Sequence, residues 1–336
     1  MITVFVSGAG GGVGQGIIKS LKLIDDLNIR IIAADMGALS AGLYAADRCY
    51  LIPKASEERY VDYLLGIFCK ESVDFYFPGT DVELLKCAEN AVYIKNKSGT
   101  TVVVSPYEAI ELSDDKYLTY EFLEKNDLYA PASFLPSDLP ESIDFPVIVK
   151  PRIGCRSIGV SIAKNIQELN TRLEPEVGLM VQELVGTDDE EYTCTVAAVN
   201  GKVSDALILR RTLRSGDTFQ ATPVQSTVIS EYVRKIALLL HINGSCNFQL
   251  RLDNGIPKVF EINCRFSGTT PFCSQLGFNP VEFYLKAVLH KSYQSSINYD
   301  AIVLRHWTES VIDIKQYEAL QASGSLDPMK PSISKL

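Results

Sequence analysis

The chain has 336 residues, of which 46% are hydrophobic and 22% are charged. That length exceeds one ordinary hydrophobic core and predicts two or three domains, and the composition is typical of a folded globular protein. The net charge of −9 argues against a nucleic-acid partner, because duplex binding usually requires a basic face.

The cysteines and the apolar runs indicate the compartment. The eight cysteines include no C-x-x-C pair and several lie inside apolar runs, so we expect buried free thiols rather than disulfides or a zinc site. No apolar run approaches the roughly 20 residues needed to span a bilayer. The segment Met1–Gly8 is one short apolar strand without a basic start, unlike a secretory signal. We therefore expect a cytoplasmic protein with no membrane partner.

Residues 1–112 alternate short strands and helices, the pattern of a parallel sheet covered on both faces. The expected strands are Ile2–Val6, Ile29–Ala34, Arg48–Ile52, Phe75–Phe77 and Thr101–Val104, and the expected helices are Val13–Leu23, Glu57–Cys69 and Asp81–Ile94. We assign this stretch to a Rossmann-like α/β domain.

Two α+β units and a tail complete the expected order. A helix is expected to begin at Ser113-Asp114-Asp115, where a capping residue and two acids suit the positive end of a helix dipole. Residues 113–185 then hold a proline-rich loop, short strands and one helix, whereas residues 186–310 hold longer strands flanked by helices. Residues 311–336 are weakly patterned, and we expect a loosely held tail.

A glycine-rich turn, Gly8 to Gly14, follows the first strand and opens the first helix. With Asp35 at the end of the next strand, it is compatible with a dinucleotide site and hence with an NAD(P)-dependent oxidoreductase or epimerase. Glycines at such a turn also serve close packing of a helix on a strand without any cofactor. Tyr93 and Lys97 have the spacing of a dehydrogenase proton-transfer pair but come too early in the chain. This interpretation is kept as an alternative.

Two lysines and a flexible loop form a candidate polyphosphate site. Lys116 opens a helix, and Lys150 ends a strand just before the loop Pro151–Gly159, which contains glycines, two arginines and Ser157. A cation at a strand end beside such a loop is well suited to phosphate groups.

An apolar strand that runs into an acidic turn is the candidate base and sugar site. The backbone of the segment Gln182-Glu183-Leu184-Val185 can read the edge of an adenine, and Glu191 can accept hydrogen bonds from ribose hydroxyls.

Gln249, Glu261 and Asn263 form the candidate metal site. Glu261 and Asn263 are two residues apart on one strand, so both face the same side of the sheet. Three oxygen ligands suit Mg²⁺ that nucleotide phosphates also hold. Arg265 follows on the same face and can neutralise charge on a phosphoryl group in transit.

The metal site also makes a demand on the hairpin that connects its two strands. A two-residue turn at Asn254-Gly255 would set Gln249 opposite Phe260 and turn Glu261 to the other face. We therefore expect a loop of three or five residues, with Pro257 at the loop edge, because this register sets Gln249 opposite Glu261.

In this order, the motifs resemble the ATP-grasp superfamily, and most closely one synthetase half of the carbamoyl phosphate synthetase large subunit. Glu261-Ile262-Asn263-Cys264-Arg265 is similar to the family's E-x-N-P-R motif, with cysteine in place of proline. Leu213–Thr218 is similar to the loop that places a basic residue, here Arg214, near the phosphates. Gly268 stands where carbamoyl phosphate enzymes commonly have a basic residue, which argues against bicarbonate as the substrate.

The resemblance implies a Rossmann-like pre-ATP-grasp domain followed by a two-lobed ATP-grasp domain. It implies ATP with Mg²⁺ or Mn²⁺ as cofactors, and an ADP-forming carboxylate–amine ligase. A small carboxylate, with an amino acid as the favoured class, would become an acyl phosphate and pass to an amine or similar nucleophile. A homodimer is a candidate assembly. A non-catalytic ATP sensor is the second alternative, although a sensor has no need of a transition-state arginine.

The site residues that the resemblance implies are as follows: Lys150, Arg214 and Arg265 for catalysis, Lys116, Lys150, Ser157, Gln182, Glu183, Leu184, Val185 and Glu191 for ATP, and Gln249, Glu261 and Asn263 for the metal.

Overall fold

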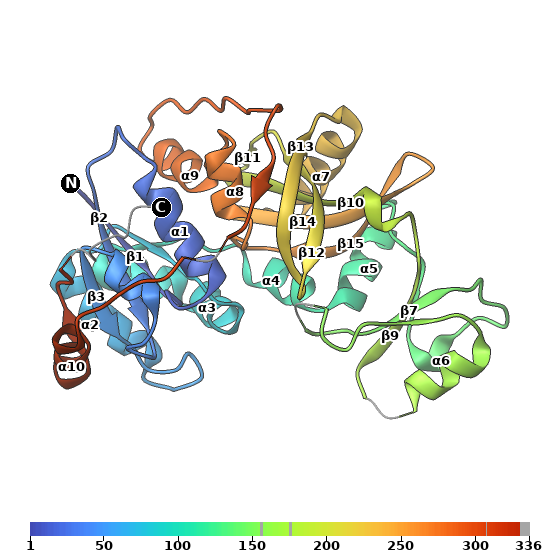
Figure 1. Cartoon of the computed structure of the whole chain (residues 1–336), viewed down its shortest axis with the longest axis horizontal. Coiled ribbons are helices and arrows are strands. Elements are labelled where there is room, and N and C mark those ends of the chain that lie inside the picture. Colours follow the sequence, from blue (N-terminus) through green and yellow to red (C-terminus); the bar gives the residue numbers. More distant parts are fainter. Residues whose placement is uncertain (155–156, 175–176, 307, 330–336) are drawn as a thin grey trace.

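Three sheets lie in a row along the long axis of the molecule in the computed structural model (Figure 1). The structure describes residues 1–154, 157–174, 177–306 and 308–329. Cys155 and Arg156 of the expected phosphate loop, and the end of the tail, lie outside the described residues. Among the helices of the described chain, none is both long and apolar enough to cross a lipid bilayer.

The first sheet has six strands in the order β17-β3-β2-β1-β4-β5, all parallel except β17. Its elements are β1 (Ile2–Val6), α1 (Gly12–Lys22), β2 (Ile29–Asp35), η1 (Ala41–Ala45), β3 (Arg48–Leu51), α2 (Tyr60–Glu71), β4 (Phe75–Phe77), α3 (Asp81–Ser98) and β5 (Thr101–Val102). Val4 and Val6 pack on the α1 side, whereas Phe5 packs on the α2 and α3 side. Burial on both faces explains why Val4, Phe5 and Val6 are apolar in succession, and the Rossmann-like class is confirmed.

The expectation of a loosely held tail is wrong. Residues 314–326 form α10 (Ile314–Ser323) and β17 (Ser325–Leu326), and β17 pairs antiparallel with the outer strand β3. Leu320 is fully buried in the apolar core that β1, β2 and α1 also share, and Arg48 forms an ion pair with Asp327 at 2.8 Å. The pattern was weak because Leu320 is the one buried residue of this helix.

A four-stranded sheet in the order β6-β9-β7-β8 forms the small lobe at the right of Figure 1. The elements of this stretch are α4 (Tyr107–Asp114), α5 (Lys116–Lys125), β6 (Ser133–Phe134), η2 (Pro136–Asp138), β7 (Val147–Pro151), β8 (Ser161–Ala163), α6 (Ile166–Leu173) and β9 (Leu179–Glu183). The helix expected to start at Ser113 begins at Lys116 instead. Asp115 caps it by accepting from the amides of Tyr117 and Leu118 at 2.8 and 3.3 Å.

The third sheet has seven strands, with β15-β14-β10-β12-β13-β16 in order and β11 on the side of β10. Its elements are η3 (Asp188–Glu190), β10 (Glu191–Val199), β11 (Lys202–Val203), β12 (Leu207–Arg214), β13 (Asp217–Val224), α7 (Thr227–Leu239), β14 (Gly244–Asp253), β15 (Ile256–Asn263), α8 (Thr270–Gln275), α9 (Pro280–Val288) and β16 (Val303–Leu304). Val281, Tyr284 and Leu285 of α9 share the apolar core of β1 and α1. The first and third sheets are therefore joined by a continuous core.

We expect Leu320→Ala to lower the free energy of unfolding by about 2–5 kcal/mol, because it leaves a cavity in a fully buried position. Ile314→Ala, on the same helix at 68% exposure, is the matched control and should change it by less than about 0.5 kcal/mol. Urea unfolding followed by circular dichroism measures both. Equal, small effects would contradict the observed docking of α10.

Candidate active site

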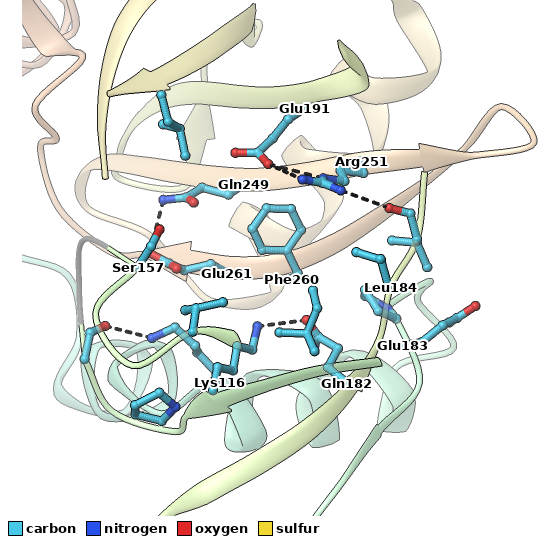
Figure 2. Close-up of a pocket in the computed structure, with 18 of the residues that line it drawn as sticks. Lys116, Ser157, Gln182, Glu183, Leu184, Glu191, Gln249, Arg251, Phe260 and Glu261 are labelled. Carbon is cyan, nitrogen blue, oxygen red and sulfur yellow. Dashed lines mark hydrogen bonds and ion pairs between the residues drawn. The ribbon is translucent and has the colours of Figure 1, made fainter. Parts of the chain in front are cut away.

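The principal cavity, of about 230 Å³, lies where the small lobe faces the third sheet. Figure 2 shows Lys116 and Gln182 on one wall and Gln249, Arg251 and Glu191 on the opposite wall. All the ATP-site residues expected from the sequence line this cavity, as do Gln249 and Glu261. Their roles stay predictions, but the fold brings together side chains that are up to 145 positions apart in the chain (116 to 261).

The hairpin that carries the candidate metal site has a different loop from the one expected. Asp253 pairs with Ile256, so the turn is the two-residue Asn254-Gly255, with φ of 50° and 81°. Pro257 lies inside the ladder opposite Leu252, which is tolerated because β15 is an outer strand of its sheet. The expectation of a three- or five-residue loop with Pro257 at its edge is wrong.

The pairing that the metal site requires is nevertheless present. Leu250 pairs with Val259 and Gln249 pairs with Glu261, so Phe260 is the extra residue of a β-bulge. The bulge corrects the register that the short turn would otherwise impose. It also lets the consecutive residues Phe260 and Glu261 both line the cavity, which strict alternation would forbid.

Glu261 is the centre of the polar cluster on this wall. One of its oxygens accepts from the side-chain amides of Gln249 at 3.1 Å and Asn263 at 3.0 Å. Arg211 donates to the amide oxygen of Gln249 at 2.7 Å, which holds the Gln249 amide with its NH₂ toward Glu261. In this conformation both amides direct their NH₂ groups at Glu261 and orient it, so Gln249 and Asn263 would each have to turn the amide over to ligate a metal.

The donor set fits a hard divalent cation that phosphates share. It consists of one carboxylate and two side-chain amides, all oxygen donors of the kind Mg²⁺ and Mn²⁺ accept. Within the described part of the chain, no cluster of three or more His, Cys, Asp or Glu side chains offers a self-sufficient metal site. Phosphate oxygens would therefore have to complete the coordination.

Lys150 is a buried cation on the opposite wall, with 5% of its surface exposed. Its ammonium group donates to Gln182 Oε1 at 2.8 Å and lies 5.6 Å from the centre of the Phe260 ring. Burial lowers the pKa of Lys150 to about 7, although the Glu261 carboxylate opposes that shift. An incoming polyphosphate would supply the missing counter-charge.

Lys116 connects helix α5 to the phosphate loop. Its ammonium group donates to the carbonyl of Gly154 at 2.8 Å, and its amide donates to the carbonyl of Arg152 at 3.0 Å. Arg152 in turn forms an ion pair with Asp115, the cap of α5, at 2.6 Å. The first half of the loop is thus anchored to α5. Ser157, with φ of 56°, lines the cavity from the far half.

Two arginines that sequence reasoning did not select hold Glu191 at the rim. Arg211 and Arg251 contact its two carboxylate oxygens at 2.8 and 2.9 Å. Both arginines line the cavity, as does Phe260. Alternation along β12 and β14 could have placed the arginines on the site face, but only if the pairing of these strands with β10 were known.

The segment expected to meet a base, Gln182 to Val185, lines the same cavity. The Glu183 carboxylate accepts from the amide of Ala132 at 3.0 Å and pairs with Lys258 at 3.1 Å, which fixes the exit of β9. Beside it, Arg251 approaches the carbonyl of Val185 at 3.5 Å.

A second cavity, of about 160 Å³, adjoins the first and shares Lys116, Gly154 and Glu261 with it. Asn263 and Arg265 line this second cavity. Arg265 donates to both carboxylate oxygens of Asp81 and, at 3.1 Å, to the amide oxygen of Asn263. Arg214 lines neither cavity. Its guanidinium stacks on Phe219 at 5.2 Å near the turn between β12 and β13, and its catalytic role stays a prediction.

The glycine-rich turn is filled by the chain itself. Asp35 accepts from the amides of Gly10 at 2.7 Å and Gly37 at 3.2 Å, so it is occupied in holding the turn. A Cβ at Gly14 would lie 2.3 Å from the carbonyl oxygen of Gly8, so close packing requires glycine there. The turn lines neither of the two cavities described above. This arrangement favours the packing role over the dinucleotide interpretation.

Two family models match separate parts of the chain. Residues 176–310 match the family model "ATP-grasp in the biosynthetic pathway with Ter operon", and residues 11–103 match "PylC-like, N-terminal domain". The arginine-specific carbamoyl phosphate synthase large chain of Neurospora crassa is 24% identical over 83% of this chain and 26% of its own length. The arginine-specific large chain of Bacillus subtilis is 23% identical over 79% of this chain and 27% of its own length. The chain thus spans about a quarter of the length of these relatives.

Solved structures share the fold. N5-carboxyaminoimidazole synthetase from Staphylococcus aureus, in complex with ADP, has a TM-score of 0.73 at 17% identity, covering 96% of this chain and 86% of that one. An L-amino acid ligase from Bacillus licheniformis has a TM-score of 0.66 at 19% identity, covering 86% and 73%. The expected architecture, a Rossmann-like domain before an ATP-grasp domain, is confirmed.

The lowered pKa of Lys150 predicts a pH-dependent stability. Between about pH 7 and the ordinary lysine pKa of 10.5, the unfolded chain binds a proton that the folded chain does not, so folding stability rises with pH. The free energy of unfolding of the wild type minus that of Lys150→Met should rise by up to about 1.4 kcal/mol per pH unit across this window.

Urea unfolding at pH 7.5, 8.5 and 9.5 tests this. Taking the difference cancels the buried tyrosines and cysteines, whose raised pKa values act in the opposite direction. A difference that does not change with pH would show that Lys150 keeps its charge in the folded protein.

Proposed function

We propose that this chain, which carries an ATP-grasp domain behind a PylC-like N-terminal domain, is an ADP-forming ligase that activates a small carboxylate. One observation carries the proposal: Lys116 on one wall of a single cavity faces Glu261 and Gln249 on the other (Figure 2). Lys150, which donates to Gln182, lines the same cavity. Cations on one side and metal-type oxygen donors on the other are what a metal-bound nucleoside triphosphate requires.

In this proposal ATP lies between the small lobe and the third sheet. The backbone from Glu183 to Val185 meets the adenine, and Glu191 meets the ribose. Lys150, Lys116 and the loop with Ser157 contact the phosphates. Glu261 and Asn263 would hold Mg²⁺ or Mn²⁺, which supplies neutralising charge to the β- and γ-phosphates. Gln249 and Arg211 keep the Glu261 carboxylate oriented.

The chemistry is a transfer in two steps. A carboxylate oxygen of the substrate bonds to the γ-phosphorus while the bond to the bridging β–γ oxygen breaks, and ADP leaves with the electron pair. An amine or similar nucleophile then attacks the acyl carbon, loses a proton and displaces inorganic phosphate. Lys150 and Arg265 stabilise the charge that spreads over the transferring group, which is the main contribution a protein makes to this step.

The second cavity supports a substrate site beside the γ-phosphate. It opens onto the nucleotide cavity at Glu261 and Lys116 and is bounded by Arg265. A carboxylate placed there would lie next to the transferring group. An ATP sensor has no need of this adjoining cavity, and the occupied glycine turn gives no support to an oxidoreductase.

Residues 1–112, 113–185 and 186–310 are the proposed functional units, and 311–336 is a tail whose residues 314–326 return to the first unit. The chain spans only about a quarter of the length of its carbamoyl phosphate synthase relatives. The proposed activity therefore does not include the complete reaction of those larger proteins. We further propose a cytoplasmic location and a homodimer, which sedimentation would test.

The direct test is phosphate release from ATP and Mg²⁺, screened over carboxylates and amines singly and in pairs. We expect no sustained release with ATP alone and release that depends on one carboxylate and one nucleophile, with an ADP-to-phosphate ratio of one. Equilibrium binding of NAD(H) at micromolar concentration without binding of ATP would contradict the proposal.

Variants of Lys150 and Arg265 should differ in how they change KM for ATP and kcat. Lys150→Met should raise KM for ATP and lower kcat, because Lys150 contacts phosphate in both the bound and the transition state. Arg265→Ala should act mainly on kcat, with a loss on the order of 10²–10³-fold. Lys202→Ala, an exposed residue of the short strand β11, is the control and should match the wild type. Small, equal losses in kcat from both variants would count against the two roles.

A further inference from the structure

Three buried side chains form a hydrogen-bonded chain that begins outside the nucleotide cavity and ends inside it. Ser133 Oγ accepts from Gln182 Nε2 at 2.8 Å, and Gln182 Oε1 accepts from the Lys150 ammonium group at 2.8 Å. Lys150 and Gln182 line the cavity, whereas Ser133 is buried behind them and does not line it. Ser133 can therefore influence the site only through its neighbours.

The register of the small-lobe sheet brings these three side chains together. Ser133 on β6 pairs with Gln182 on β9, and Gln182 pairs on its other side with Ile148 on β7. Paired residues point to the same face of a sheet, and so do residues two apart on one strand, which places Lys150 on the face of Ile148. Three neighbouring strands thus each contribute one polar residue to the same face.

The direction of the hydrogen bonds is set from the Ser133 end. The Ser133 hydroxyl donates its single proton to the carbonyl oxygen of Pro131 at 2.9 Å, and a carbonyl oxygen can only accept. Toward Gln182, Ser133 Oγ is therefore left as an acceptor. The Gln182 amide has its NH₂ group on that side, so its oxygen faces Lys150.

Backbone contacts hold Ser133 in place against β9. The amide of Glu183, next to Gln182, donates to the carbonyl of Ala132 at 2.8 Å, and the Glu183 carboxylate accepts from the amide of Ala132 at 3.0 Å. Lys258 pairs with the same carboxylate at 3.1 Å. The position of the Ser133 hydroxyl is therefore fixed by its neighbours in the chain rather than by the cavity.

Lys150 depends on the orientation of the Gln182 amide. An ammonium group has three donors and no acceptor, and among the described residues Gln182 Oε1 is the one acceptor bonded to it. Burial lowers the pKa of Lys150 to about 7, the Glu261 carboxylate opposes this shift and Lys116 adds to it. If the amide were turned over, its NH₂ group would face the ammonium group, and the two donors would repel each other.

We propose that Ser133 is a positioning residue for Lys150 in the ATP site. Its hydroxyl sets the orientation of the Gln182 amide, and the amide oxygen holds the Lys150 ammonium group at the cavity where the phosphates bind. This role rests on the proposed function, because it concerns the binding of ATP by that same site. Ser133 itself touches neither ATP nor the substrate.

Removal of the hydroxyl is the first test. Ser133→Ala leaves Gln182 Nε2 without its acceptor, and the amide is then free to turn over. We expect the Kd for a non-hydrolysable ATP analogue with Mg²⁺, measured by titration calorimetry, to rise about 3- to 30-fold. KM for ATP should rise with it. Ser137→Ala, at an exposed serine of η2, is the matched control and should bind the analogue as the wild type does.

A second pair of variants separates the hydroxyl from the packing. Ser133→Thr and Ser133→Val place nearly the same shape at this buried position and differ by a hydroxyl against a methyl group. The threonine variant should bind the analogue about threefold or more tighter than the valine variant, because it keeps the acceptor for Gln182. Equal binding by the two variants would overturn the proposal.

The effect of Ser133→Ala should also require Lys150. In the Lys150→Met background the amide has no ammonium group to hold, so adding Ser133→Ala should change the Kd by less than about twofold. A residue that served only to keep β6 in place would give the same fold-change with and without Lys150. That result would overturn the proposal even if binding were weakened.

Failure of this role can be told from failure of the proposed function. Weaker nucleotide binding in Ser133→Ala that requires Lys150, without phosphate release for any pair of substrates, would keep the role of Ser133 and remove the ligase. Substrate-dependent phosphate release with the same Kd in the wild type and in Ser133→Ala would keep the ligase and remove the role.

Discussion

The β-bulge at Phe260 places Glu261 on the same face of the third sheet as Gln249, and the polar wall of the cleft depends on that placement. With a regular ladder, the tight Asn254-Gly255 turn would point Glu261 out of the cavity. Gln249, Arg211 and Asn263 would then lose the carboxylate around which they are arranged. The extra residue is used as well, because the Phe260 ring lies beside the ammonium group of Lys150. One inserted residue thus links the two walls.

On the opposite wall of the cleft, Lys150 lacks an anionic partner among the described residues, and this favours the binding of a polyanion. Lys150 is buried with a lowered pKa, and its one neutral hydrogen-bond partner is the Gln182 oxygen. Phosphate groups would restore its charge, so binding and protonation are coupled. Glu191 shows the opposite condition, since two arginines already satisfy it. In the cleft, the Glu191 carboxylate is therefore already paired with cations, whereas the Lys150 ammonium group has no anionic partner bonded to it among the described residues.

The N-terminal sheet contributes to the cleft by holding Asp81 next to Arg265. Helix α9 shares a core with β1 and α1, and Phe77 at the end of β4 packs on Phe266. These contacts bring Asp81 to Arg265, which lies 184 positions away in the chain. Gly8 and Gly14 of the first turn and Gly79 after β4 serve the same purpose, since they let backbone segments meet closely. Their sequence resembles a cofactor loop because both uses require backbone contact at a strand–helix junction.

The sequence by itself determined the parts of this protein that depend on local pattern. Apolar runs predicted the parallel strands of the Rossmann-like sheet, and the short motifs around Lys116, Lys150, Glu191 and Glu261 identified about half of the residues that line the cleft. The tertiary structure decided what depends on partners distant in the chain: the bulge at Phe260, the return of α10 and β17 to β3, and the place of Arg211 and Arg251. The physical reason is that a propensity or a turn signal acts over a few residues. Register and ion pairing are set by whichever strand lies alongside, and the sequence of one strand does not specify its neighbour.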